Sequence, residues 1–148
     1  MTISGSGVLD LGNLSSTAYS TGTVSIEIGT NAVNGASVTA ASTNAGMTNI
    51  SSTGNVINSL SADGFADSYR FTSNISVASD STAVGFAQTG GLSQEVNSTA
   101  AATVYTSNKP QNLTGVNDVD FSVSAMPNIQ TPAGDYRDIV VITVTGNF

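Results

Sequence analysis

The sequence predicts an all-β fold, an antiparallel β-sandwich or small barrel, in a single domain over residues 1–148. Apolar and polar residues alternate with a period of two along much of the chain. Turn-forming Gly, Asn and Pro residues separate about eight or nine such segments, which is typical of a sandwich or barrel. The chain also ends on its most hydrophobic segment, as expected for a strand that closes a sheet.

The alternation begins at the N-terminus, where residues 2–11 predict a strand that has glycines, Gly5 and Gly7, in its middle. Residues 22–28 alternate in the same way. Asn34-Gly35 is a hairpin signal, so residues 36–41 are expected to form the returning strand. The polar stretch 43–62 is expected to be a long loop with one short strand.

Further strands are predicted over residues 69–77, 83–87, 102–106 and 119–125. Pro132 and Gly134 form a turn before the last strand, which is rich in β-branched residues. The predicted core positions are Val24, Ile26, Phe71, Ile75, Val119, Phe121, Val123 and Val141.

The last strand is apolar on both faces. Ile139 and Val141 lie on one face, and the other face carries Tyr136, Val140, Ile142 and Val144. A strand that is apolar on both faces is normally covered on both. The sequence therefore predicts that a neighbouring subunit covers one face, and the alternative is that residues 43–62 fold over it.

Charged residues are only 9% of the chain, and the net charge is −7. The three basic residues, Arg70, Lys109 and Arg137, are too few for a phosphate-backbone footprint or for binding to anionic membranes. The longest aliphatic run, residues 139–142, is far shorter than the roughly 20 residues of a membrane span. The sequence thus predicts no nucleic-acid partner and no membrane insertion.

The hydroxyl- and amide-rich composition is common on secreted and cell-surface proteins, which favours an extracellular location. No signal peptide is recognisable at the start. An exported protein of this sequence would be the mature form, whereas a native Met1 would mean release by lysis or retention in the cell.

Histidine and cysteine are both absent, which excludes Ser-His-Asp and Cys-His catalysis and most zinc or iron sites. Glycoside hydrolysis would need only two carboxylates, and the candidate pairs are Asp63 with Asp67 and Asp118 with Asp120. Because the chain has no Trp and few aromatic residues, it offers few side chains on which a sugar ring could stack. We therefore expect no enzymatic activity.

Two clusters of oxygen ligands, residues 63–67 and 117–120, could hold calcium. We favour the reading that these side chains hydrogen-bond their own backbone in turns, so neither a metal nor another cofactor is expected. Lys109 could form a covalent link to Asn147 beside a buried carboxylate, but its place before a proline favours an exposed turn.

The turn at residues 131–136, with the strand that follows, resembles the closing strand of bacterial surface-filament subunits of the spore coat U and archaic chaperone-usher pilin group. Residues 8–12 and 22–26 are similar to the opening of such domains. The resemblance implies an immunoglobulin-like sandwich, a structural subunit of a cell-surface filament and assembly of identical subunits by strand donation. Those pilins commonly carry a cysteine pair, which this chain lacks.

Residues 2–11 are the predicted donor strand, which completes the sheet of a neighbouring subunit. Large apolar side chains at its ends can fill pockets of that subunit, and the central glycines fit where the acceptor groove is shallow. The alternative is that they form the first strand of their own sheet. The predicted assembly residues are Ile3, Gly5, Gly7, Leu9, Leu11, Val140, Ile142 and Val144. The competing functions are a carbohydrate- or receptor-binding surface module and, if Met1 is native, a virion surface protein.

Overall fold

The computed structural model describes residues 2–4, 7–59, 67–77, 93–96, 98–108, 110 and 117–148. The described part of the chain is all-β, contains no helix, and pairs its strands antiparallel throughout. The strands are β1 (Thr2–Ser4), β2 (Ser20–Glu27), β3 (Ala36–Ser42), β4 (Met47–Asn49), β5 (Val56–Ile57), β6 (Ser68–Val77), β7 (Ser93–Glu95), β8 (Ala102–Thr106), β9 (Asn117–Met126), β10 (Tyr136–Arg137) and β11 (Val140–Gly146).

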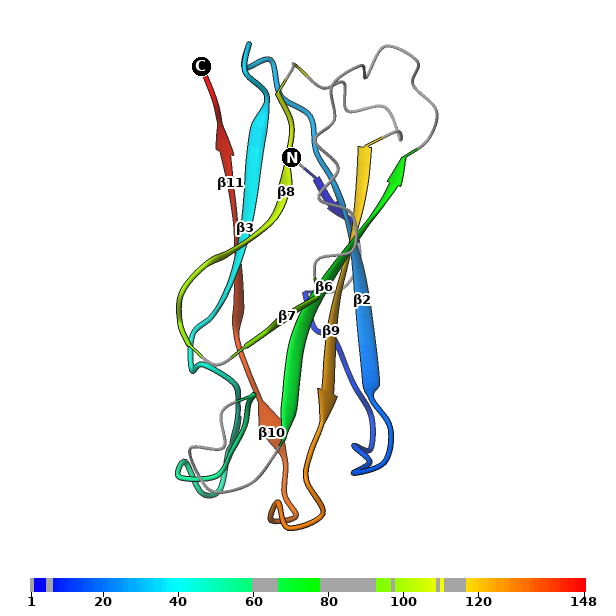
Figure 1. The fold of residues 1–148 in the computed structure, drawn as a ribbon, viewed down its shortest axis with the longest axis vertical. Coiled ribbons are helices and arrows are strands. Elements are labelled where there is room, and N and C mark those ends of the chain that lie inside the picture. The colour runs from blue at the N-terminus through cyan, green and yellow to red at the C-terminus, as the bar shows by residue number, and fades with distance from the viewer. Residues whose placement is uncertain are drawn as a thin grey trace.

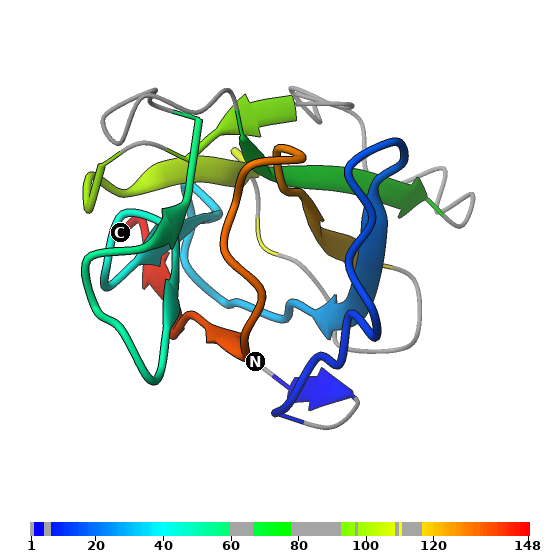
Figure 2. The same cartoon turned by 90° about the horizontal axis from the view of Figure 1, so that it is seen from below.

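These strands form three sheets (Figure 1). The largest has the order β1-β2-β9-β6-β7. A second sheet, called the β11 sheet below, has the order β11-β3-β8, and a small third sheet has the order β10-β4-β5. The view from below shows β11 and β3 on the opposite side of the molecule from β2 (Figure 2). The edge strands β1 and β11 each lack a described partner on one side.

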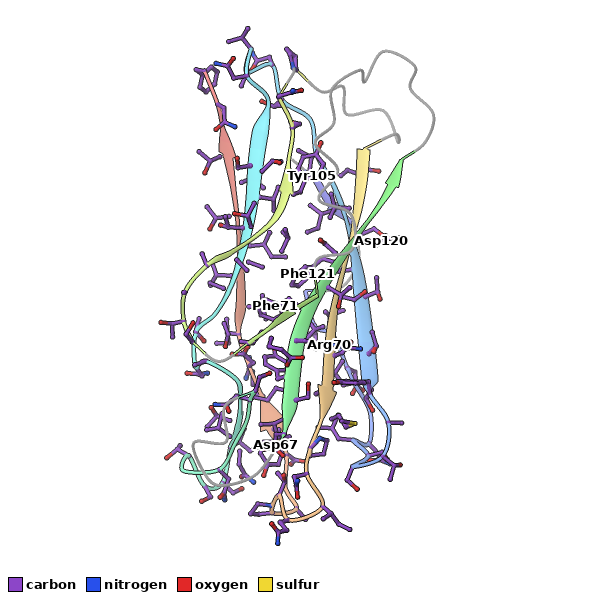
Figure 3. All side chains as sticks on the ribbon, in the orientation of Figure 1. Asp67, Arg70, Phe71, Tyr105, Asp120 and Phe121 are labelled. Carbon is purple, nitrogen blue, oxygen red and sulfur yellow. The ribbon has the colours of Figure 1, made fainter. Side chains whose placement is uncertain are left out.

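One buried cluster joins the sheets. Phe121 of β9 is 1% exposed, and its ring centroid lies 5.3 Å from that of Phe71 on β6. Tyr69 meets Phe71 edge to face at 5.7 Å. Figure 3 shows Phe71 and Phe121 in the middle of the molecule. Val38 of the β11 sheet and Ile57 of the small sheet belong to the same cluster, so all three sheets share one core.

The structure confirms five of the predicted core positions: Ile26, Phe71, Val119, Phe121 and Val123 are buried. Val24 is half-buried and packs against the cluster. The side chain of Ile75 lies outside the described residues. The prediction for Val141 was wrong, because the residue is 48% exposed while its neighbours Val140 and Ile142 point inward.

The strand predictions hold for β2, β3, β6, β8 and β9 and need correction at the two ends of the chain and in the segment after β3. Among the described residues of 2–11, Thr2–Ser4 form a strand and residues 7–11 do not, and residues 43–59 contain two short strands instead of one. The predicted strand at residues 83–87 lies outside the described residues. The last strand is interrupted after Arg137 and resumes at Val140.

Asn34-Gly35 forms a turn but not a hairpin. Gly35 has φ +77°, a conformation that glycine adopts without steric cost, and its amide donates to the Ala32 carbonyl. An added Cβ would collide with the Ser107 backbone. The strands on either side of the turn, β2 and β3, belong to different sheets, so the chain crosses between sheets at this point.

Candidate functional site

The outer edge of β11 is the main candidate site. At one end the Thr43 amide donates to the Ile139 carbonyl at 2.9 Å, and at the other the Asn147 amide donates to the Gly35 carbonyl at 2.8 Å. Hydrogen-bonded pairs alternate along an antiparallel ladder, so the odd-numbered residues of β11 bond to β3. The backbone N–H and C=O groups of Val140, Ile142 and Val144 therefore point to the open edge.

The side chains of β11 alternate between the inward and the outward face of the sheet. Val140, Ile142 and Val144 are half-buried and pack against the core. Ile139 and Val141 point outward and are 53% and 48% exposed, so the described residues 43–59 do not cover them in the single chain. The outward face thus remains apolar at one end, next to an edge whose backbone groups have no partner among the described strands.

The predicted donor segment lies on its own sheet. β1 pairs with β2 from Thr2 opposite Glu27 to Ser4 opposite Ser25, which leaves the other edge of β1 without a described partner. The side chain of Ile3 and the whole of Gly5 lie outside the described residues. Gly7 is exposed, with open space where a Cβ would stand.

Leu9 and Leu11 turn inward and pack against the core of their own chain. They lie over Gly22, whose position on β2 has the same parity as the inward-facing Val24 and Ile26. A Cβ at Gly22 would lie 3.0 Å from Leu11 Cδ2 and 3.3 Å from Leu9 Cβ. The missing side chain at Gly22 therefore makes the room that the two leucines fill.

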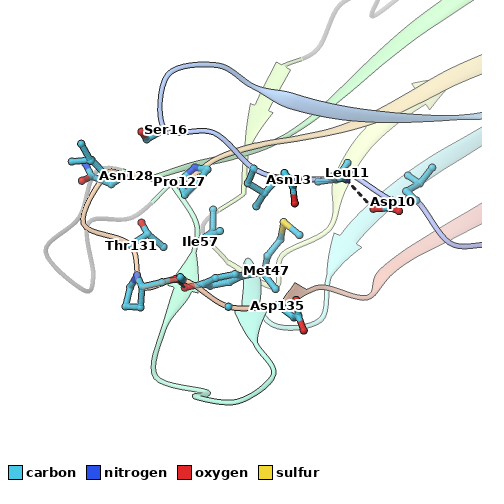
Figure 4. Close-up of a pocket in the computed structure, with 18 residues that line it drawn as sticks. Asp10, Leu11, Asn13, Ser16, Met47, Ile57, Pro127, Asn128, Thr131 and Asp135 are labelled. Atoms are coloured by element: carbon cyan, nitrogen blue, oxygen red, sulfur yellow. Dashed lines mark hydrogen bonds between the residues drawn. The ribbon is translucent and has the colours of Figure 1, made fainter.

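A hollow of about 560 Å³ lies at the same end of the molecule (Figure 4). The segment with Leu11 forms one wall, and Met47 and Ile57 of the small sheet form another. The turn after β9 and the start of β10 complete it. Asp10, Asn13, Asn128, Thr131 and Asp135 supply polar groups to its lining.

The described aspartates that were candidates for catalysis or calcium binding, Asp67 and Asp120, lie in separate parts of the fold. Asp67 Oδ1 accepts hydrogen bonds from Thr131 Oγ1 at 2.6 Å and from the Asn128 amide, so Asp67 anchors the turn after β9. Asp120 accepts from Ser25 Oγ at 2.6 Å across two strands. Asp63 and the side chain of Asp118 lie outside the described residues. Within the described ranges, no group of three acidic, His or Cys side chains is placed to hold a metal.

Sequence reasoning missed a pair formed by a buried tyrosine and a half-buried carboxylate. Tyr69 Oη on β6 donates to Asp138 Oδ2 at 2.9 Å, and the Ile139 amide donates to Asp138 Oδ1 at 2.8 Å. Burial and the charge of Asp138 raise the pKa of Tyr69 far above its usual value, so the phenol stays a donor. Burial also raises the pKa of Asp138, although hydrogen bonds from Ser42, Tyr69 and the backbone oppose this shift.

We expect Asp138→Asn to flatten the dependence of stability on pH. A carboxyl whose pKa is higher in the folded than in the unfolded state disfavours folding once it is charged. Its effect is absent well below pH 3.8, the unfolded value, and grows as the pH rises through the raised folded pKa. The asparagine can still accept the Tyr69 hydrogen bond. Urea unfolding of both chains at several pH values measures the difference, and identical curves would contradict the prediction.

A second contact missed from the sequence links Tyr19 to Arg70, whose guanidinium carbon lies 3.8 Å from the ring centroid. Tyr19 Oη also donates to Ser68 Oγ at 2.8 Å. No sequence motif predicts these two contacts of Tyr19, because the paired residues are about fifty positions apart. Lys109 lies outside the described residues, and Asn147 Nδ2 donates to Ser37 Oγ at 3.4 Å.

No protein-family model matches the chain, and neither a curated protein nor a solved structure is significantly similar to it. A helix long and apolar enough to cross a membrane is not found in the described part of the chain. The resemblance of residues 131–136 and the following strand to surface-filament subunits stays a prediction.

Proposed function

We propose that this chain is a non-enzymatic structural subunit of an extracellular filament or surface layer, and that its two larger sheets form an immunoglobulin-like sandwich. Identical copies assemble by β-strand complementation. The edge strand β1 keeps its place on β2 and offers its free edge to β11 of the next copy. Because the two edges differ, the contact is head to tail, and it produces an open chain of subunits when the rotation between successive copies does not close a ring.

The open edge of β11 is the observation that carries this proposal. Val140, Ile142 and Val144 turn their side chains into the core, and the ladder alternation turns their backbone groups outward. An unprotected edge strand of this kind is a template for pairing with another chain. No charged residue or proline within Val140–Gly146 blocks it, although native edges are commonly blocked in these ways.

The chemistry of the chain supports a structural role. Histidine and cysteine are absent from the sequence. The described carboxylates that were candidates for catalysis, Asp67 and Asp120, each accept short hydrogen bonds that tie strands or turns together. Hydroxyl pairs between β2 and β9, such as Thr23 with Ser122 at 2.8 Å, serve the same purpose.

We expect Ile142→Pro to abolish polymerisation while Ile142→Ala does not. Both variants lose the packing of the isoleucine side chain, but only proline removes the outward N–H and places a ring on the docking edge. Sedimentation velocity and negative-stain microscopy of concentrated protein measure assembly, and circular dichroism checks the fold. If Ile142→Pro and Ile142→Ala both polymerise, or if both fail to polymerise, the edge of β11 is not the place where the next subunit pairs. If the unsubstituted chain stays monomeric, the proposal fails.

The hollow favours a second candidate, a carbohydrate- or receptor-binding surface module. Its volume of about 560 Å³ falls in the range of small-ligand sites, and Asp10, Asn128 and Asp135 offer hydrogen-bonding groups to a polar ligand. Screening glycans against the unsubstituted chain and Asp135→Ala tests it. Binding that is lost in Asp135→Ala, without filaments, would favour this function over assembly.

A further inference from the structure

Charge is segregated between the sheets. The strands β3, β8 and β11, which the structure describes in full, contain no Asp, Glu, Lys or Arg. The five-stranded sheet carries Glu27, Arg70, Glu95, Asp118 and Asp120 on its strands. In a chain with a net charge of −7, one sheet is therefore free of charge from end to end. Arg137 and Asp138 lie just before the start of β11.

The outer face of the β11 sheet, called the threonine face below, is built from small and β-branched residues. The strand register places Thr143, Thr39 and Thr103 in one row across all three strands. Thr145, Ser37 and Thr106 form the next row. Val141 and Ala41 begin a third row. The face thus carries methyl and hydroxyl groups, and its outer strands expose Val141, Thr143 and Thr103.

We propose that the threonine face is a contact surface for a second copy of this chain, packed sheet on sheet about a two-fold axis. Two copies that each carry seven negative charges in excess repel one another over most orientations. The threonine face lets two sheets approach without placing like charges opposite each other. β-branched side chains also suit face-to-face sheet packing, with the sheets about 10 Å apart.

The size of the face sets the strength of the contact. Seven residues of β3 span about 23 Å, and three strands span about 14 Å, so each copy offers roughly 320 Å². A pair would bury roughly 650 Å², well below the 1,200 Å² or so at which specific complexes become stable. The contact is therefore weak between free chains and becomes effective when copies are already linked, as a lateral contact between neighbouring chains of subunits. It uses a face of the β11 sheet and not its edge.

Cross-linking tests this inference, because a chain without cysteine accepts single thiols cleanly. Thr39 lies on the central strand in the middle row, so a two-fold axis through the face brings two copies of this residue together. Thr39→Cys is treated with a bis-maleimide whose span matches the ~10 Å separation of packed sheets. Thr23→Cys, on the outer face of the five-stranded sheet, is the matched control. Thr103→Cys, which is exposed, replaces Thr39→Cys if that variant does not fold.

We expect at least about fivefold more covalent dimer from Thr39→Cys than from Thr23→Cys. Adding Val141→Asp should remove this excess, because it places a charge on both facing sheets, whereas Thr21→Asp on the other sheet should not. High salt, which shortens the screening length to about 3 Å at 1 M, should raise the yield. Equal yields, or a yield that Val141→Asp leaves unchanged, would overturn the inference.

The same measurement in the full chain carrying Ile142→Pro separates this inference from the proposed function. If edge assembly is lost and the cross-linked excess remains, the face and the edge are independent contacts. If the Ile142→Pro chain still forms filaments, the proposal for the edge fails. The ratio of covalent dimer from Thr39→Cys to that from Thr23→Cys then still tests the threonine face. Because the contact is weak between free chains, the excess should shrink when the filaments are lost and still exceed the Thr23→Cys level at high protein concentration. No excess over Thr23→Cys at any concentration overturns the inference.

Discussion

Phe121→Ala should lower the free energy of unfolding by about 3–5 kcal/mol, the usual cost of removing a large buried aromatic side chain. Phe121 is 1% exposed, lies on β9 between β2 and β6, and contacts the ring of Phe71 at a centroid distance of 5.3 Å. Its removal leaves a cavity that the neighbouring strands cannot close, because backbone hydrogen bonds fix them on both sides. A domain of ordinary stability has only about 5–15 kcal/mol to lose.

Urea unfolding, followed by circular dichroism, measures this loss. Phe148→Ala is the matched control, because its ring is 87% exposed and an exposed substitution usually changes stability by less than about 0.5 kcal/mol. A cost of less than about 1 kcal/mol at Phe121 would mean that the inward face of β9 has been assigned wrongly.

The central strands could be predicted from the sequence because their burial is one-sided. In β9, Val119, Phe121 and Val123 alternate with polar residues, and the period of two fixes which side chains point inward. β11 is apolar on both faces, so its parity is ambiguous from sequence. The choice of Val141 as a core residue was wrong for this reason.

Long-range contacts could not be predicted from local pattern. Asn34-Gly35 signals a turn, but the sheet that β3 joins depends on its pairing with β8 and β11, far along the chain. The pair of Tyr69 and Asp138 is separated by 69 residues and has no motif. Gly22 did carry a usable signal, since a glycine among inward-facing residues of a strand marks a place where another segment approaches closely.

Ser73 shows how tertiary packing overrides composition. The alternation of β6 places it among inward-facing residues, and it is fully buried although it is polar. Its hydroxyl has no hydrogen-bond partner in the structure. The backbone register with β9, in which Ser73 stands opposite Phe121, fixes its position regardless of the side chain.

Deleting residues 1–11 should abolish polymerisation and leave a folded chain that binds a peptide of the deleted sequence. The deletion removes β1, and with it the free edge that we propose pairs with β11 of the next copy. It also removes Leu9 and Leu11, which pack over Gly22, so some stability is lost. The strands β2, β9 and β6 of one sheet and β3 and β11 of another keep all of their pairing to one another, and the chain should stay folded.

Light scattering measures polymerisation, and fluorescence anisotropy of the labelled peptide measures binding. The peptide should bind the truncated chain and lose most of its affinity when that chain also carries Ile142→Pro, because strand addition needs the outward backbone groups of β11. A peptide with Leu9→Asp and Leu11→Asp separates the two places where it could dock. If these changes abolish binding while Ile142→Pro does not, the peptide binds only at its own place beside β2, and pairing with β11 of another copy is contradicted. If the truncated chain unfolds outright, the segment belongs to the fold and strand donation fails.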